Sequence, residues 1–224
     1  MTFELETGGA VDLSQTVTNG MTIYLGDPVP SVRRVKQIRT DGVNVSEVLL
    51  GSHTGTHVDA PLHFIEGGKS VDTLSPELCV GEAVVIDLGD KPQGSEISPE
   101  DLGRGSLVDK DGLIVLLYTG MSKLWKNLAA RTNFTYLSPE AADWLVLKKA
   151  KTVGIDYLSV EKFGSRDAPV HRKLLSNGIP IIESLNEKLG IFAGKRIFLV
   201  CLPLKVGGSD GGPARALAYP LRAR

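Results

Sequence analysis

Thirteen residues in the first third of the chain, Ser52 to Phe64, restrict its possible structures more than any other stretch. They read Ser-His-Thr-Gly-Thr-His-Val-Asp-Ala-Pro-Leu-His-Phe and hold three of the four histidines of the protein. Imidazole nitrogens and carboxylate oxygens are the usual protein ligands of zinc and manganese ions. The stretch therefore predicts a metal or catalytic site, and an ordinary exposed polar turn is the weaker interpretation.

The backbone of this stretch must bend if its side chains are to meet. On one continuous strand, His53 and His57 would lie roughly 13 Å apart at about 3.3 Å per residue, which is too far for two ligands of one ion. Gly55, Pro61 and the β-branched residues between them argue against a helix. We therefore expect a sharp bend at Gly55, where glycine can take a positive φ, and then an extended segment in which His57 and Asp59 point the same way.

The composition of the chain indicates one globular domain. The 224 residues are 42% hydrophobic and 23% charged, which is typical of soluble globular proteins. The net charge of −1 gives no basic footprint for nucleic acid, and no apolar run approaches the ~20 residues of a membrane span. Residues 1–9 lack the basic start and apolar core of a signal peptide, so we expect a cytoplasmic protein. Cys79 and Cys201 are expected to be reduced thiols in the core.

Apolar patterns predict strands in the first third of the chain and alternating strands and helices in the rest. The strands are expected at 10–14, 20–30, 32–40, 43–50, 82–88, 112–118, 152–157, 179–183, 196–203 and 214–219, with a hairpin turn at 41–42. Helices are expected to begin at Ser98, to run from Ser138 to about Ala150 with Trp144, Leu145 and Leu147 in the core, and to span 167–177 with Asp167 as the cap. This pattern predicts an α/β protein with a mixed sheet in one domain, residues 1–224.

Two further candidate ligands lie in the second half of the sequence. His171, the fourth histidine, falls near the first turn of the helix expected at 167–177. Glu183 ends the apolar run at 179–182, where a buried carboxylate would need a partner or a metal ion. Glu183 could equally be the first exposed residue after the strand, and the residues themselves leave both interpretations open.

The stretch from His53 to His63 resembles the H-x-G-T-H-x-D-x-P-x-H signature of the putative cyclase family, which includes bacterial kynurenine formamidases and isatin hydrolases. All seven defining positions match. The run at 208–216 is similar to the family's Gly-Asp-Gly-Ser-Pro-x-Arg-Ala ending, so the resemblance covers most of the chain. It implies the swivelling β/β/α fold. Together with apolar residues such as Met21 and Leu25 near the pocket-side turn, it also implies a homodimer.

Carried over to this sequence, the family pattern implies a centre of two divalent ions, with zinc expected and manganese as the alternative. In this pattern, His53 and His57 would bind the first ion, and His171 would bind the second. The carboxylates of Asp59 and Glu183 would bridge both ions. His63 would remain free as the proton-transfer residue. Zinc would lower the pKa of water toward ~7 and polarise the substrate carbonyl.

The resemblance also implies a reaction, the hydrolysis of N-formylkynurenine to kynurenine and formate, a step of tryptophan catabolism. The family's formamidases carry Trp-Pro-Gly-Asp where this chain has residues 24–27, Tyr-Leu-Gly-Asp, so Tyr24 would replace the Trp that packs on the substrate. One alternative is an enzyme of the same fold that opens a cyclic amide or lactone, as isatin hydrolase does with a single manganese ion. The other is a non-catalytic module that binds a metal or a small ligand.

Overall fold

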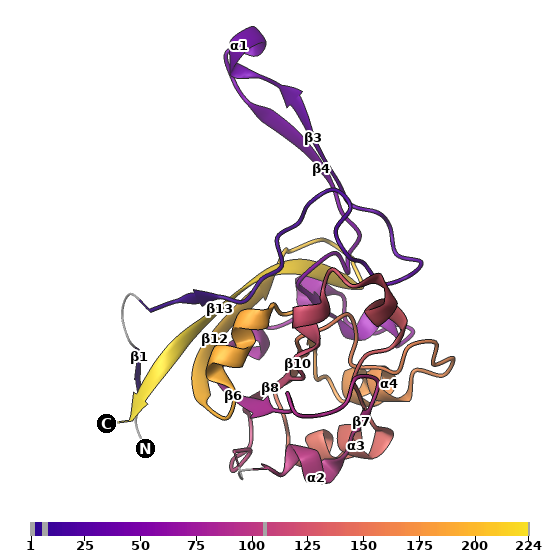
Figure 1. Cartoon of the computed structure of the whole chain (residues 1–224), viewed down its shortest axis with the longest axis vertical. Helices are drawn as coiled ribbons and strands as arrows, with labels where there is room; N and C mark the ends of the chain where they lie inside the picture. Colours follow the sequence, from indigo (N-terminus) through magenta and orange to yellow (C-terminus); the bar gives the residue numbers. More distant parts are fainter. Residues whose placement is uncertain (1–2, 6–8, 105–106, 224) are drawn as a thin grey trace.

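The fold is built around a mixed sheet whose strand order closes on itself. The computed structural model describes residues 3–5, 9–104 and 107–223, and nine of its strands pair in this sheet. Seven of the nine are β5 (His57–Asp59), β6 (Val80–Asp87), β8 (Ile114–Tyr118), β10 (Thr152–Ile155), β11 (Ile181–Glu183), β12 (Arg196–Pro203) and β13 (Gly211–Ala223). They follow the order β13, β12, β6, β8, β10, β11, β5, and β5 pairs with β13 again to close a barrel-like ring. Figure 1 labels β13, β12, β6, β8 and β10 of this sheet.

Both strand directions occur in this ring. β6, β8, β10 and β11 run parallel to one another. The pairings of β6 with β12, β12 with β13, β13 with β5 and β5 with β11 are antiparallel. Two short strands, β1 (Phe3–Leu5) and β2 (Val11–Asp12), pair antiparallel with β13. The predicted α/β architecture with a mixed sheet is confirmed.

Side-chain alternation along the strands divides the core in two. Val84 and Ile86 of β6 pack against the helices, whereas Ala83 and Val85 face the interior of the ring. Successive side chains of a strand point to opposite faces, so a fully buried run such as β6 serves both halves of the core. Cys201 belongs to the interior half, and both cysteines are buried and free, as predicted.

Three helices cover the parallel part of the sheet: α2 (Pro99–Leu102), α3 (Pro139–Leu147) and α4 (Pro169–Ser176). Ser98 forms the predicted capping box, and the Ser138 side chain accepts a hydrogen bond from a backbone amide at the start of α3. The prediction that α3 continues to about Ala150 with Leu147 in the core is wrong. The helix ends at Leu147, whose side chain lies on the solvent side and is 77% exposed.

Residues 20–30 are the main error of the strand predictions. They alternate apolar and polar residues as a strand would, but they form turns and irregular chain instead. The carbonyl of Ile23 accepts hydrogen bonds from the Arg131 guanidinium, and the Thr22 hydroxyl donates to the carbonyl of Trp125. A side chain thus satisfies a backbone carbonyl that a neighbouring strand would otherwise bind, and residues 22–24 and 27 line a pocket instead.

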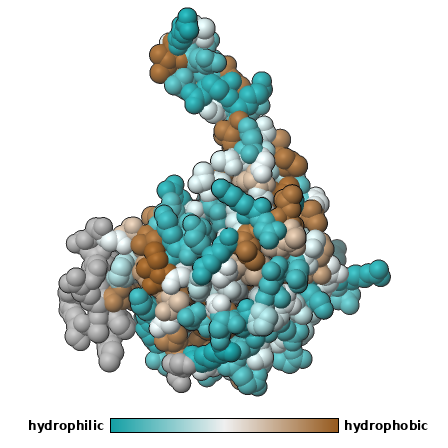
Figure 2. Space-filling model, in the orientation of Figure 1, coloured by the Kyte–Doolittle hydropathy of each residue, from teal (hydrophilic) through white to brown (hydrophobic). Residues whose placement is uncertain are grey.

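A hairpin arm projects from the body of the molecule (Figure 1). It comprises β3 (Ser31–Lys36), the short helix α1 (Ile38–Asp41) and β4 (Val45–Leu49), and its two strands pair only with each other. The predicted hairpin is confirmed, although a helical turn closed by Gly42 replaces a tight two-residue turn. Every residue of the arm except one is exposed, and brown apolar side chains are visible on it in Figure 2.

The remaining ordered elements are small. β7 (Glu96–Ile97) and β9 (Tyr136–Leu137) form a two-stranded parallel pair near the helices, and several short 3-10 turns connect the strands. Within the described ranges, no helix is both long and apolar enough to cross a membrane. The N-terminal stretch expected to carry no signal peptide lies partly outside those ranges.

Candidate metal centre

β5 places two of the predicted ligands at the seam of the sheet. It lies between β11 and β13, with His57 opposite Glu183 and Asp59 opposite Gly211. His57 and Asp59 are two residues apart on one strand, so they share a face as predicted. The bend before them also follows the prediction, because Gly55 has φ +64°, and it folds the preceding turn back so that His53 reaches Asp59.

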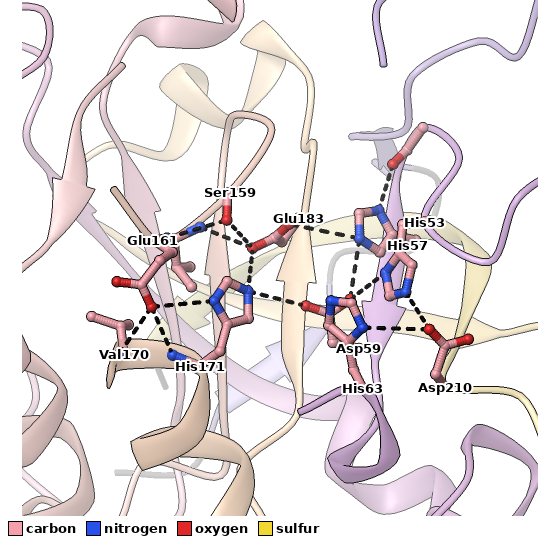
Figure 3. A network of polar contacts seen from close by, with 12 residues as sticks. His53, His57, Asp59, His63, Ser159, Glu161, Val170, His171, Glu183 and Asp210 are labelled. Atoms are coloured by element: carbon pink, nitrogen blue, oxygen red, sulfur yellow. Dashed lines mark hydrogen bonds and ion pairs between the residues drawn. The ribbon is translucent and has the colours of Figure 1, made fainter. Parts of the chain in front are cut away.

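Asp59 lies at the centre of the cluster (Figure 3). Its Oδ1 is 2.8 Å from Nδ1 of His53 and 3.2 Å from Nε2 of His57. Its Oδ2 lies 3.6 Å from Nε2 of His171, which comes from helix α4. One carboxylate therefore faces three imidazoles with its two oxygens.

Glu183 approaches the same imidazoles with a second carboxylate. Its Oε1 is 3.3 Å from Nε2 of His171, and its Oε2 is 3.7 Å from Nε2 of His57. Only 5% of Glu183 is exposed, so its interpretation as the first exposed residue after the strand is wrong. The backbone N–H of Val160 and the Ser159 hydroxyl donate to Oε1 and hold the carboxylate in place.

His63 stands beside the cluster, on a 3-10 turn that Pro61 begins. Its ring stacks at 4.0 Å from that of His53, and its Nδ1 is 3.4 Å from Oδ2 of Asp210. The side chain is 26% exposed, more than that of His53, and burial lowers the pKa of His63 below its usual value. The structure thus brings all five predicted ligands and His63 together.

The sequence did not indicate two carboxylates that lie behind these histidines. Asp210 accepts from Nε2 of His53 at 2.9 Å, and Glu161 lies 3.4 Å from Nδ1 of His171. Asp210 lies in the glycine-rich run at 207–212, and Glu161 lies on the chain after β10, whereas Glu183 is the last residue of β11. The available signal for Glu161 was the same as for Glu183, a carboxylate that closely follows apolar residues.

The carboxylates favour the protonated forms of His53 and His171. Burial opposes the charged form of His53, but Asp59 and Asp210 raise its pKa to about 10. Burial also opposes ionisation of Asp210, yet His53 lowers the pKa of that carboxyl to about 2. The pKa of His171 lies well above its usual value, because the carboxylates around it outweigh its burial. The cluster as a whole favours positive charge at its centre.

Two buried atoms test whether a metal ion fits this cluster. Nε2 of His57 and Oδ2 of Asp59 form no hydrogen bond with any group in the described part of the chain. Buried polar atoms without a partner are rare and costly. Both atoms are metal-ligand types, and His53, His57 and Asp59 each offer a ligand atom within 4.8 Å of the others. The residues present therefore fit a divalent metal site.

A cavity of about 170 Å³ opens above the cluster. One wall is the irregular segment with Ile23 and Tyr24, and the other includes Phe64 and Leu158. The Tyr24 ring, predicted to contact substrate, is half-buried and lies 5.5 Å from the ring of Phe163. Apolar and aromatic side chains thus share the cavity lining with polar ones such as Asp27 and Lys162.

Comparison with known proteins identifies the class that this fold and site define, the metal-dependent hydrolases. A solved structure described as a potential metal-dependent hydrolase with cyclase activity superposes with a TM-score of 0.80 at 31% identity, over 96% of this chain and 98% of that one. The family model described as "Putative cyclase" matches residues 11–162. The chain belongs to this cyclase family.

The relatives are enzymes of related chemistry. Kynurenine formamidase of Geobacillus thermodenitrificans is 34% identical over 214 residues, which cover 92% of this chain and 95% of the relative. Isatin hydrolase A of Ralstonia solanacearum superposes with a TM-score of 0.84 at 25% identity, over 94% of this chain and 91% of that one. The predicted family, fold and hydrolase class are confirmed.

Proposed function

We propose that this protein hydrolyses the amide bond of an aryl formamide, with N-formylkynurenine as the substrate, to give the arylamine kynurenine and formate. The observation that carries the proposal is the convergence of three imidazoles and two carboxylates below a cavity that Tyr24 and Phe64 help to line. Two ligand-type atoms of this cluster are buried without a hydrogen-bond partner in the described part of the chain. The kynurenine formamidases among its relatives support the choice of substrate.

The centre would hold two divalent ions, zinc by preference and manganese as the alternative. His53 and His57 would bind one ion and His171 the other, while Asp59 and Glu183 lie between the two groups. Such ions supply Lewis acidity, which lowers the pKa of water toward ~7 and polarises the substrate carbonyl. The surplus of carboxylates around the imidazoles supports a site for more than one positive charge.

His63 would carry the proton of the reaction. It takes a proton from the attacking water and returns it to the aniline nitrogen as the carbon–nitrogen bond breaks. Three features support this role: His63 lines the cavity, it is the most exposed imidazole of the group, and its Nδ1 faces Asp210, which can orient the ring. Tyr24 would pack against the aromatic ring of the substrate, as its position in the cavity wall suggests.

A second candidate is a cyclic amide or lactone, as an isatin hydrolase-like enzyme would open. The likeness to isatin hydrolase A and the substitution of Tyr24 for the formamidase Trp favour it. Both reactions begin with the attack of water on an acyl carbon and end with cleavage of the bond from that carbon to nitrogen or oxygen, so the same residues serve either one. A non-catalytic module is disfavoured. A structural metal site is closed and needs neither an adjoining cavity nor an imidazole that binds no metal, and this cluster has both.

Turnover of a small substrate panel tests the proposal. The zinc-loaded and manganese-loaded protein is assayed with N-formylkynurenine, formanilide, isatin and a simple lactone. We expect the highest kcat/KM for N-formylkynurenine. Faster opening of isatin or the lactone would favour the second candidate, and no hydrolysis of any of the four would contradict a hydrolase of either kind.

The enzyme would act as a homodimer in the cytoplasm. The exposed arm supports the dimer, because a lone two-stranded hairpin is only marginally stable in water and this one presents Ile38, Val48 and Leu49 to solvent. Leu25, on the turn near the base of the arm, is also exposed. The two free thiols are compatible with a reducing compartment.

A further inference from the structure

Glu161 is a buried carboxylate to which the proposed reaction assigns no role. It is 8% exposed and lies on the chain that follows β10 and leads toward α4. Its Oε2 accepts hydrogen bonds from the backbone N–H of Val170 at 3.0 Å and of His171 at 3.2 Å. The same oxygen lies 3.4 Å from Nδ1 of the His171 ring, as Figure 3 shows.

Helix α4 depends on this carboxylate for its N-terminus. The first N–H groups of a helix need acceptors from outside the helix. The predicted cap, Asp167, is wrong: the N-cap position is Ala168, which has φ +44° and no side chain able to cap. Glu161 supplies the acceptor from another segment, and a carboxylate at this end is also favoured by the helix dipole. It therefore anchors the turn of helix that carries His171.

The position of Glu161 relative to the His171 ring decides what it can do. Nε2 of His171 faces Asp59 and Glu183, whereas Glu161 faces Nδ1 on the other side of the ring. A neutral imidazole has one N–H donor and one lone-pair acceptor. A proton held on Nδ1 by Glu161 leaves the lone pair on Nε2, directed at the two carboxylates of the centre.

We propose that Glu161 is a positioning residue that fixes the orientation and tautomer of His171 for metal binding. One carboxylate oxygen contacts both the backbone amide and the ring of His171, so the helix start holds Glu161 in place and a turn of the ring would give up its contact with it. This inference rests on the proposed metal centre but not on the proposed substrate. It concerns the ion that His171 would hold, not the reaction that follows.

The test measures zinc affinity by competition with a chromophoric chelator, and compares Glu161→Gln with the unsubstituted protein. Glutamine keeps an oxygen that can accept from the helix amides but removes the charge that favours the Nδ1 proton. We expect a loss of about 10–100-fold in affinity for the ion at His171, the usual effect of removing such a partner. Nitrogen-15 spectra of the zinc-loaded unsubstituted protein should show the proton of His171 on Nδ1.

Two controls separate positioning from folding. Asp167→Ala removes a carboxylate from the same helix start, but Asp167 is exposed and does not touch the His171 ring, so zinc affinity should not change. In the His171→Ala background, Glu161→Gln should cause no further loss of zinc, because its effect acts through the ring.

These measurements test the role of Glu161 separately from the proposed metal centre and the proposed substrate. Unchanged zinc affinity in Glu161→Gln, an equal loss in the His171→Ala background, or a proton on Nε2 of His171 would each overturn the role of Glu161. Failure of the unsubstituted protein to bind zinc or manganese would instead overturn the metal centre. Normal zinc binding without hydrolysis of a formamide would leave the inference standing and contradict only the proposed substrate.

Discussion

His57 and His63 are six residues apart in the sequence, but their environments differ in ways that matter for chemistry. His57 donates from Nδ1 to the carbonyl of Gly55 at 2.8 Å, and its buried Nε2 points at the carboxylates without a hydrogen bond. His63 is partly exposed and faces the cavity. The first arrangement is typical of a metal ligand and the second of a group that moves protons.

Substitution of these two histidines should therefore have different effects. His63→Ala should keep its metal ions and lose ~10²–10⁴-fold in kcat, the usual contribution of general acid–base catalysis. His57→Ala should lose metal, because it removes a ligand. Metal content by plasma emission spectroscopy and turnover of N-formylkynurenine are measured on both. A metal-depleted His63→Ala protein that regains activity in excess zinc would identify His63 as a ligand.

The two thiols give a prediction about reactivity. Burial raises the pKa of Cys79 to about 11 and that of Cys201 well above its usual value. A raised thiol pKa means that the reactive thiolate is scarce at pH 8. The folded protein should therefore resist alkylation by iodoacetamide at pH 8, whereas the urea-unfolded protein should take up two labels. Rapid labelling of the folded protein, followed by mass spectrometry, would show that the thiols are accessible.

The local sequence indicated the candidate metal ligands in residues 53–63 more clearly than it indicated the carboxylates that contact the histidines from behind. The signature from His53 to His63 has fixed residue types at fixed spacing, so it could be recognised without coordinates. Glu161 and Asp210 contact His171 and His53 across 10 and 157 residues of sequence. Their local sequences do not indicate which histidine each carboxylate contacts, and only the folded chain brings each one behind its histidine.

At the scale of elements, the metal centre depends on how closely β13 approaches β5. Gly211 lies opposite Asp59, and a Cβ on it would stand 2.9 Å from Cε1 of His53 and 3.0 Å from the carbonyl oxygen of Val58. Contacts this short require the strand or the imidazole to shift. Any side chain at this position therefore disturbs the sheet and the ligand together.

Gly211→Ala should destabilise the fold by about 1–3 kcal/mol, the usual cost of overpacking, and should weaken zinc binding. Gly207→Ala is the matched control, because a Cβ there meets no atom within 4 Å. Thermal unfolding and zinc affinity are measured for both variants. Equal stability and affinity in the two alanine variants would mean that the strand adjusts without cost, contrary to this account.

Periodicity predicted the long strands but not how they join. The buried runs of β6, β8 and β10 were expected, because a short unbroken apolar run indicates a strand that is buried on both faces. Closure of the ring depends on β5, whose three residues pair with both β11 and β13, and so short a strand has no periodic signal. Residues 20–30 show the opposite error, since alternation without a neighbouring strand does not make a strand.

At the scale of the whole molecule, the hairpin arm supports the proposal of a dimer. The double variant Ile38→Asp, Val48→Asp places charge on its apolar surface, and we expect it to convert a dimer into a monomer. Leu147→Asp is the control, since Leu147 is exposed on helix α3, away from the arm. Light scattering at micromolar concentration gives the mass of each. A monomer mass for the unsubstituted protein, or dimers of the arm variant, would contradict this role of the arm.

We propose that this cyclase-family protein hydrolyses an aryl formamide with divalent metal ions held by His53, His57, Asp59, His171 and Glu183. The most direct measurement is a zinc titration of the chelator-stripped protein, followed by kynurenine release from N-formylkynurenine. We expect no turnover without metal and a rise that reaches its plateau at two zinc ions per chain. Turnover by the stripped protein equal to that of the loaded protein would contradict the account.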